Sequence, residues 1–397
     1  MHAGQRFAEF AVREARGVSP TYERLATAVS ADTALLTLLT GLPPAKQQPN
    51  LLFGVIRLLG GPVDDPRAFH DFTLAHWPAV LAELLARSTQ TNEPGRCAPL
   101  LPVLASLRQP LALLEVGASA GLNLFPDQYA YRYTGTPGQP GPPHLPPVPG
   151  RADTSISAQL GTPRLPPVPG RADTSTSVQP GPHHPPPVPG RADTSTSVQP
   201  GPHHPPPVPG RADTSTSVQP GTPHLPPVLD CAVTGAMPAA RLPEVVWRAG
   251  MDLHPLDVTD PADVAWLDAL IWPEHTHRRT RLRAAATIAA ADPPHLVTGD
   301  LVDDLAALAG QAPPHAALVI FHTSVLYQVP PERKSAFTTL VRNLPAHWIS
   351  IEAPEVLPFR DLPAPPDDRL HNVLALDGVP LAWVEGHGQA MTWFGRV

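Results

Sequence analysis

The sequence predicts an α/β protein built on a doubly wound, mostly parallel sheet, with a helical region before it and antiparallel strands at its C-terminal edge. Three patterns lead to this prediction. Up to about residue 107, apolar residues recur every three or four positions, which is typical of helices that bury one face. From residue 111 onward, short apolar runs alternate with helical stretches, which indicates parallel strands joined by right-handed crossovers. Near the end of the chain, two apolar runs flank Asp377-Gly378, which predicts a β-hairpin.

The helical region covers residues 1–110 and contains clear start signals. Ser19 precedes Pro20, and Asp65 precedes Pro66. In each pair, a side chain that can cap a helix stands before a proline at the first helical position, where the missing N–H costs nothing. We therefore expect helices to begin at these two prolines.

The α/β domain is predicted at residues 111–397. Its first buried strand is the run Leu111-Ala-Leu-Leu-Glu-Val-Gly117, which is short, apolar and ends in glycine. Further parallel strands are expected at residues 245–247, 295–297, 317–321 and 348–350, with helices at 261–271, 274–291, 301–310 and 331–344. Antiparallel strands are expected at residues 373–376, 381–384 and 389–394.

Residues 137–228 interrupt this domain with a tandem repeat of twenty residues, whose shared segment ends at residues 155, 175, 195 and 215. The segment 137–227 contains 27 of the 57 prolines and no Phe, Trp or Tyr. Each unit has too few apolar residues to offset the entropy of ordering its backbone, so we expect a disordered, polyproline-like insertion. A proline-rich ligand for a protein partner is an open alternative.

Composition excludes several classes of function. The formal net charge of -7 and the pI of about 6.2 leave no basic excess that would attract nucleic acid. We predict no metal, because duplication accounts for the His pairs of the repeats, and Cys97 and Cys231 match neither a metal-ligand nor a disulfide spacing. The N-terminus lacks the apolar core of a signal peptide, and no uninterrupted apolar stretch could span a membrane. A cytoplasmic protein without membrane contact is expected.

The turn after the first strand is the main functional candidate, and two functional readings are possible. Glu115 precedes a run of small residues, Gly117-Ala-Ser119-Ala-Gly121, whose backbone amides could approach a ligand closely. The same residues match the nucleophile elbow of serine hydrolases, with Ser119 as nucleophile.

The hydrolase reading would need Asp300 or Glu352 as the acid and His387 as the base. A hydrolase elbow follows several earlier strands, whereas this turn follows the first strand, where cofactor loops of doubly wound folds lie. We therefore favour a cofactor loop. The structural alternative is that Gly117 and Gly121 only allow close packing.

Residues 115–121 resemble the first motif of class I S-adenosylmethionine-dependent methyltransferases, in which an acidic residue precedes a glycine-rich turn. This resemblance implies a Rossmann-like methyltransferase-type sheet and S-adenosylmethionine as cofactor, held by Glu115, Gly117, Ala118, Ser119 and Gly121. Ser119 stands where the motif usually has its central glycine.

A larger part of the chain is similar to an uncharacterised bacterial family, domain of unknown function 2332. The stretches that carry this similarity are Thr89-Gln-Thr-Asn-Glu93 with Arg96, residues 113–127, 248–274 and 347–354, and Gly299-Asp300. They cover nearly everything outside the repeats. The family implies the fold and no particular reaction.

The methyltransferase scheme implies roles for further residues. Asp252, after the second strand of the scheme, would bind the ribose hydroxyls, and Asp300, after the third, would meet the adenine amino group, although each could instead cap a turn or a helix. His322 is the candidate general base and Glu352 the second candidate.

The helical region would contribute Asn92, Glu93 and Arg96 to substrate binding. The arginines at residues 278–283 are interpreted as a solvated helix face and are not included in the site.

We therefore expect transfer of a methyl group from S-adenosylmethionine to a small molecule whose identity the sequence leaves open. Such a reaction needs an aligned donor and acceptor and few catalytic side chains. The alternatives are a non-catalytic ligand-sensing or interaction protein that retains the fold, and a serine hydrolase that uses Ser119.

Overall fold

The computed structural model describes residues 2–135 and 225–396. All of them belong to one of the two units into which the chain divides, residues 1–150 with 224–397. The insertion predicted at residues 137–228 falls almost wholly outside the described residues. Only its last residues are described, and Val228 begins a strand.

The N-terminal part is helical, as the sequence predicts. Its helices are α1 (Ala3–Phe10), continued by the π-helix η1 (Ala11–Ala15), then α2 (Pro20–Ala31), α3 (Thr33–Thr40), η2 (Pro44–Lys46), α4 (Pro49–Leu58), α5 (Pro66–Ala75), α6 (Trp77–Ala86), η3 (Pro94–Arg96) and α7 (Cys97–Ser106). Both expected caps are confirmed, because the side chain of Ser19 accepts a hydrogen bond from Tyr22 N and that of Asp65 accepts from Arg67 N and Ala68 N.

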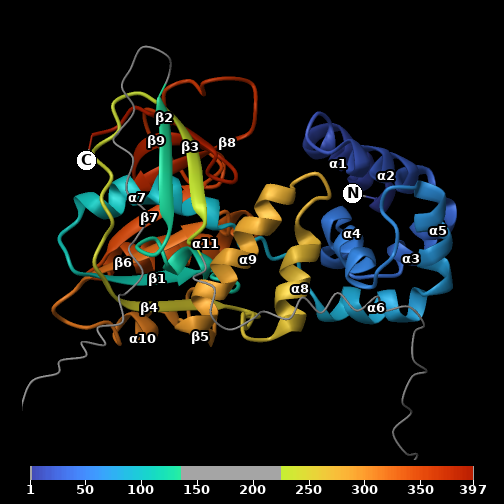
Figure 1. Cartoon of the computed structure of the whole chain (residues 1–397), viewed down its shortest axis with the longest axis horizontal. Coiled ribbons are helices and arrows are strands. Elements are labelled where there is room, and N and C mark those ends of the chain that lie inside the picture. Colours follow the sequence, from blue (N-terminus) through green and yellow to red (C-terminus); the bar gives the residue numbers. More distant parts are fainter. Residues whose placement is uncertain (1, 136–224, 397) are drawn as a thin grey trace, which may run out of the picture. The chain divides into compact units, whose positions relative to one another are not determined.

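Phe53 of α4 lies at the centre of the helical core. Its ring packs edge-on against Phe7, Phe10 and Phe69 at centroid distances of 5.7–6.1 Å, and Tyr22 tilts against it at 4.8 Å. Trp266 of α8 (Pro261–Leu270) belongs to the same buried cluster. The helical part therefore packs onto the α/β part through α8, as Figure 1 shows.

The sheet has ten strands in the order β2-β3-β10-β9-β8-β7-β6-β1-β4-β5. Their bounds are β1 (Leu111–Val116), β2 (Ala130–Gly135), β3 (Val228–Thr234), β4 (Val245–Asp252), β5 (His295–Thr298), β6 (Ala317–Thr323), β7 (His347–Glu352), β8 (His371–Leu376), β9 (Val379–Glu385) and β10 (Ala390–Trp393). Strands β5, β4, β1, β6 and β7 are mutually parallel, which confirms the mostly parallel sheet.

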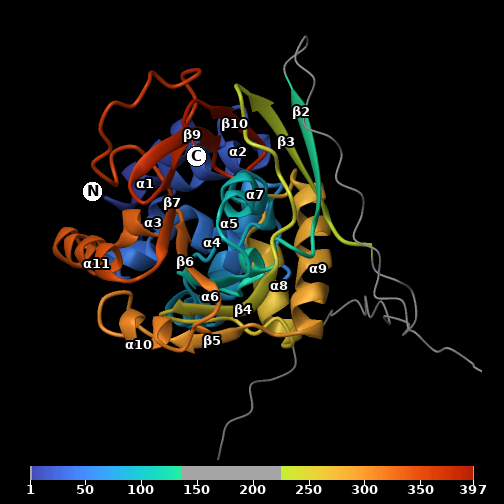
Figure 2. The ribbon, with the colours of Figure 1, turned by 90° about the vertical axis from the view of Figure 1, so that its left-hand side faces the viewer.

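Helices cover both faces of the sheet. The remaining ones are α9 (Thr276–Ala291), η4 (Leu122–Leu124), α10 (Leu305–Ala309), η5 (Leu326–Gln328) and α11 (Pro331–Asn343). Leu113 of β1 packs in one core with α7 and α9, whereas the next residue, Leu114, packs in another with α10 and α11. Figure 2 shows α11 and α9 on opposite sides of β6 and β7. β1 is therefore buried along its whole length, with parallel neighbours on both sides, as the apolar run predicts.

The prediction for the sheet edge is wrong. The hairpin of β8 and β9 forms where expected, and both neighbours of β8 are antiparallel to it. However, these strands lie inside the sheet, because β10 pairs in parallel with β3, and β3 pairs with β2, which forms the edge. Neither β2 nor β3 was predicted. In β3 the side chains of Leu229, Cys231 and Val233 alternate inward, so the pattern of a half-buried strand was present.

In the described part of the chain, no helix is both long and apolar enough to cross a membrane.

Candidate functional site

The predicted site residues gather at one edge of the sheet. Because β5, β4, β1, β6 and β7 run in parallel, their carboxyl ends meet at the same edge. In the sheet, β4 and β5 lie on one side of β1, and β6 and β7 lie on the other, so the strand order reverses beside β1. In open α/β sheets, ligands bind outside the carboxyl ends of the strands at such a switch point. Glu115, Asp252, His322 and Glu352 lie in the last residues of these strands, and Asp300 follows β5 by two residues.

The turn after β1 is closed and held against the end of β4. Gly117 N and Ala118 N donate to Met251 O at 2.8 and 3.0 Å, and Ser119 N donates to Asp252 Oδ2 at 2.9 Å. Gly117, Ser119 and Gly121 have φ angles of 69°, 52° and 71°, in the region that favours glycine. The turn is followed by the three-residue 3-10 helix η4.

Gly117 of this turn faces the side chain of Val325. A Cβ atom at Gly117 would lie 2.5 Å from Val325 Cγ2, so Val325 fills the space in front of Gly117. Gly117 is therefore required by the positive φ and by the packing of Val325, which agrees with the structural alternative for this residue.

Two buried oxygen atoms at the turn have no hydrogen-bond partner in the part of the chain that the structure describes. Glu115 is 1% exposed, and its Oε1 accepts from Asn123 Nδ2 at 2.8 Å. Glu115 Oε2 and Ser119 Oγ form no hydrogen bond with the described residues. Burial raises the pKa of Glu115 to about 8, although the Asn123 hydrogen bond and the charge of Arg96 oppose the shift. A buried oxygen without a partner indicates either a cost to stability or a place for a ligand.

Asp252 and Asp300, the two aspartates expected to bind the cofactor, accept hydrogen bonds from backbone N–H groups. Asp252 Oδ1 accepts from His254 N at 2.9 Å, in addition to the bond from Ser119 N to Oδ2. Asp300 Oδ1 accepts from Val302 N at 2.7 Å, while Asp300 Oδ2 accepts no hydrogen bond from the described residues. Burial opposes a low pKa at Asp300, but this backbone bond and an ion pair with Arg333 lower it below its usual value. Both aspartates therefore serve as turn caps, and each keeps lone pairs that could accept further bonds.

His322 and Glu352 form a buried pair. His322 Nδ1 lies 2.7 Å from Glu352 Oε1, and Trp348 Nε1 donates to His322 Nε2 at 3.0 Å. Because Nε2 accepts a bond, the proton of a neutral ring lies on Nδ1 and points at Glu352. Glu352 Oε1 also accepts from Val325 N and Leu326 N. The pair thus holds η5 in place, and both ring nitrogens of the candidate base already have partners.

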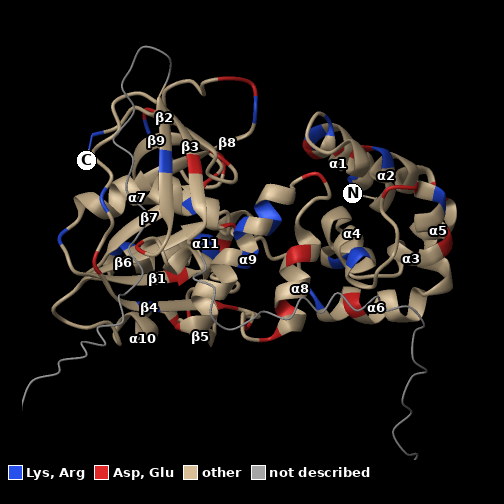
Figure 3. Ribbon diagram, viewed as in Figure 1, with Lys and Arg blue, Asp and Glu red and all other residues tan. Residues whose placement is uncertain are grey.

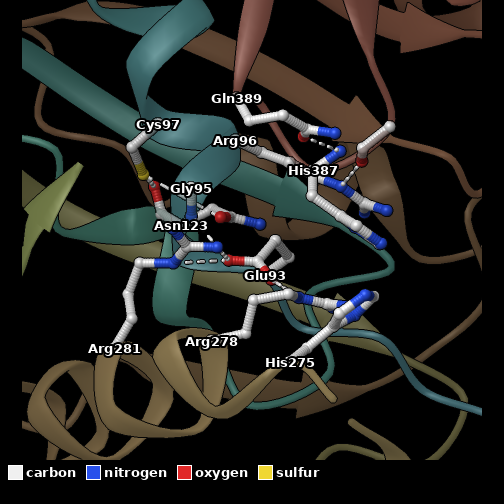
Figure 4. Close-up of polar contacts among 11 residues, drawn as sticks. Glu93, Gly95, Arg96, Cys97, Asn123, His275, Arg278, Arg281, His387 and Gln389 are labelled. Carbon is white, nitrogen blue, oxygen red and sulfur yellow. Dashed lines mark hydrogen bonds and ion pairs between the residues drawn. The ribbon is translucent and has the colours of Figure 1, made fainter. Parts of the chain in front are cut away.

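The loop before α7 brings Asn92, Glu93 and Arg96 to the same edge. Asn92 Oδ1 accepts from Leu122 N at 2.9 Å, so it fixes the turn after β1. Glu93 is fully buried and pairs with Arg278 at 2.6 Å and Arg281 at 2.7 Å, as Figure 4 shows. Burial alone would raise the pKa of Glu93, but the two guanidiniums lower it to about 2.

The sequence interpretation missed Arg278 and Arg281 of α9, because it treated all the arginines of this helix as a solvated face. Their side chains are 7% and 13% exposed and bind Glu93, whereas Arg283 of the same helix is 63% exposed. Figure 3 shows the basic residues of α9 in its N-terminal half. A signal existed, because the buried residues of α9 follow Arg278 at helical spacing: Leu282, Ala285, Ala286 and Ala289.

The hydrolase constellation is not brought together in the described residues. Ser119 Oγ has no hydrogen-bond partner there, and His387 lies among the charges of Arg278, Glu93 and Arg96. No group of three or more His, Cys, Asp or Glu side chains in residues 2–135 and 225–396 is arranged to hold a metal ion.

Fold and site place this chain among α/β proteins whose polar residues gather at the carboxyl edge of a mostly parallel sheet. The chain belongs to the DUF2332 family, described as an uncharacterized protein conserved in bacteria, which matches residues 4–172 and 211–393. The similarity noted in the sequence is thus confirmed. No curated protein and no solved structure matches the chain.

Proposed function

We propose that the chain binds S-adenosylmethionine at the carboxyl ends of β1, β4 and β5 and transfers its methyl group to a small molecule. The observation that carries the proposal is the order β5-β4-β1-β6-β7, with a carboxylate at or just after the end of each of the first three strands. These strands are neighbours, and adjacent strands lie about 4.8 Å apart. The carboxylates of Asp300, Asp252 and Glu115 therefore line one continuous stretch of the edge.

The adenosine part suits the groups at β4 and β5. Leu253 follows Asp252 at the end of β4 and is 62% exposed. An exposed leucine next to Asp252 offers an apolar surface for a base, while the carboxylates of Asp252 and Asp300 offer acceptors for ribose hydroxyls and an exocyclic amine. Asp252 would hold the ribose, and Asp300 Oδ2 would accept from the base.

The cationic part suits the turn after β1. The cofactor would supply a sulfonium-bound methyl group and an ammonium group, both positively charged. Glu115 Oε2 and Ser119 Oγ are the buried oxygens at this turn without a partner among the described residues, and a bound cation would favour the ionised form of Glu115, whose pKa burial otherwise raises to about 8. Because Val325 covers Gly117, the contacts we assign lie at Glu115 and Ser119, and Gly117 shapes the turn. His322 and Glu352 act by positioning η5, so alignment of donor and acceptor is the main source of catalysis.

Calorimetric titration with S-adenosylmethionine and S-adenosylhomocysteine tests the proposal. We expect binding in the micromolar range and a loss of about tenfold or more in affinity for Leu253→Glu, which removes the apolar surface and adds a negative charge beside the base. Leu370→Glu is the matched control, because Leu370 is 79% exposed and precedes β8, which β7, β6 and β1 separate from β4.

Equal binding by wild type and Leu253→Glu would contradict the placement of the adenosine. No binding of either compound by the folded protein would overturn the proposal and favour a non-catalytic protein that keeps the fold.

A further inference from the structure

Arg96 is a buried guanidinium without a carboxylate partner among the described residues. It is 7% exposed, and its hydrogen bonds go to Gly386 O at 3.0 Å, to Thr323 O at 2.8 Å and to Thr323 Oγ1 at 3.2 Å. Arginine is almost never buried unless it is paired, because it keeps its charge at every accessible pH. Arg96 Nη2 donates no hydrogen bond to the residues that the structure describes. The guanidinium of Arg96 therefore lacks an anionic partner among these residues.

The surroundings of Arg96 carry an excess of positive charge. Arg278 and Arg281 share the single carboxylate of Glu93. Because burial raises the pKa of Glu115 to about 8, its carboxyl is neutral at pH 7, so the three guanidiniums face two charged carboxylates even when Glu352 is counted with Glu93. Nδ1 of His387 is buried and has no hydrogen-bond partner among the described residues. Burial and the positive charges of Arg278 and Arg96 lower the pKa of His387 to about 3, which agrees with an excess of positive charge here. The excess of one charge suits a monoanion.

The guanidinium lies at the switch point of the sheet. Its partner Thr323 ends β6, and its charge acts on Glu115 near the end of β1 and on Glu352 at the end of β7. It is therefore on the β6 side of the turn, whereas the groups assigned to adenosine lie on the β4 and β5 side. A molecule bound at Arg96 would approach the turn from the side opposite the cofactor's base.

We propose that Arg96, supported by Arg278, binds the carboxylate group of the methyl acceptor. The planar guanidinium presents parallel N–H donors that match a carboxylate, and such charge-assisted bonds are strongest where water is scarce. Glu93 keeps Arg278 and Arg281 extended toward the site, as Figure 4 shows. The acceptor is then a small carboxylic acid, and this assignment of the substrate class rests on the proposed methyl transfer.

Binding of acetate, in the absence of any methyl donor, tests the inference. Acetate and acetamide have nearly the same shape and differ in charge, so thermal unfolding at constant ionic strength separates charge recognition from packing. We expect acetate, well above its dissociation constant, to raise the Tm by roughly 3 °C and acetamide to leave it unchanged. Inorganic phosphate, which is larger than acetate and is partly dianionic at neutral pH, should stabilise less than acetate.

Variants locate the effect. Arg96→Gln should abolish the acetate shift, and Arg278→Gln should reduce it. Arg279→Gln is the matched control, because Arg279 is the next residue of α9, pairs with Asp268 and is 33% exposed, and it should retain the full shift. Equal shifts with acetate and acetamide, an undiminished shift in Arg96→Gln, or stabilisation by phosphate alone would each overturn the inference.

Different results would refute the proposed methyl transfer and the proposed carboxylate site. Acetate binding that depends on Arg96, without binding of S-adenosylmethionine, would retain the carboxylate site and remove the methyl donor. Binding of S-adenosylmethionine without any acetate effect in the wild type would remove the carboxylate site alone.

Discussion

The stability of this protein should fall as the pH rises from about 5 to 8, because of Glu115. Its pKa is about 8 in the folded protein, and its ordinary value is 4.5. Between these values the folded state keeps a proton that the unfolded state has released. The stabilising contribution is complete below pH 4.5 and is lost as the pH approaches 8. The difference of about 3.5 units corresponds to about 5 kcal/mol, at 1.36 kcal/mol for each unit.

The substitution Glu115→Gln isolates this contribution. Glutamine keeps an oxygen that can accept from Asn123 Nδ2, but it does not titrate. Thermal unfolding of both proteins at pH 5, 7 and 9 gives the difference in Tm at each pH, in which the titration of all other groups cancels. We expect the variant to gain on the wild type by roughly 10 °C over this range, at about 2–4 °C for each kcal/mol.

A matched variant controls for the loss of a negative charge. Glu332 lies exposed in the first turn of α11, so Glu332→Gln removes a charge without a burial effect, and its Tm should run parallel to that of the wild type. Parallel curves for Glu115→Gln and the wild type would refute the reasoning, because they would mean that Glu115 ionises in the folded protein as it does in water.

Two further predictions concern the supports of the site. Gly117→Ala should destabilise by about 1–3 kcal/mol more than Gly60→Ala in chemical denaturation: both positions have positive φ, but only at Gly117 would the new Cβ meet a side chain. Equal losses would show that Val325 moves aside freely. Trp348→Phe should cost about 1–3 kcal/mol because it leaves His322 Nε2 buried without a donor, whereas Trp383→Phe removes no hydrogen bond from the indole nitrogen and should lose less. A larger loss for Trp383→Phe would show that ring packing outweighs the hydrogen bond.

The elements with strong periodicity could be predicted from the sequence. Apolar runs predicted β1, β4, β5, β6 and β7 within a few residues, and prolines with capping residues gave the starts of α2 and α5. These signals are local, since they depend on residues close together in the chain. The position of β2 and β3 depends on pairing with β10, more than 150 residues after β3 begins, which no local pattern reports.

The placement of the site could be predicted, but the state of its side chains could not. Parallel strands bring their carboxyl ends to one edge, so Glu115, Asp252 and Glu352 were expected there. Whether a carboxylate faces a ligand or the backbone depends on neighbours within 3 Å. Asp252 accepts from Ser119 N, and Glu352 accepts from Val325 N. Both partners are fixed by the fold, far from the acidic residue in sequence.

The arginines of α9 show how one buried residue changes the interpretation of its neighbours. On the sequence, an arginine-rich helix is usually a solvated face. Glu93, from the loop before α7, selects Arg278 and Arg281 from this helix and leaves Arg279 and Arg283 to pair with Asp268. Two guanidiniums are thereby drawn into the protein for one carboxylate, beside Arg96, which has no carboxylate partner among the described residues. The surplus of positive charge at the switch point therefore follows from the placement of a single glutamate, and it is the feature that points to a carboxylic acid as substrate.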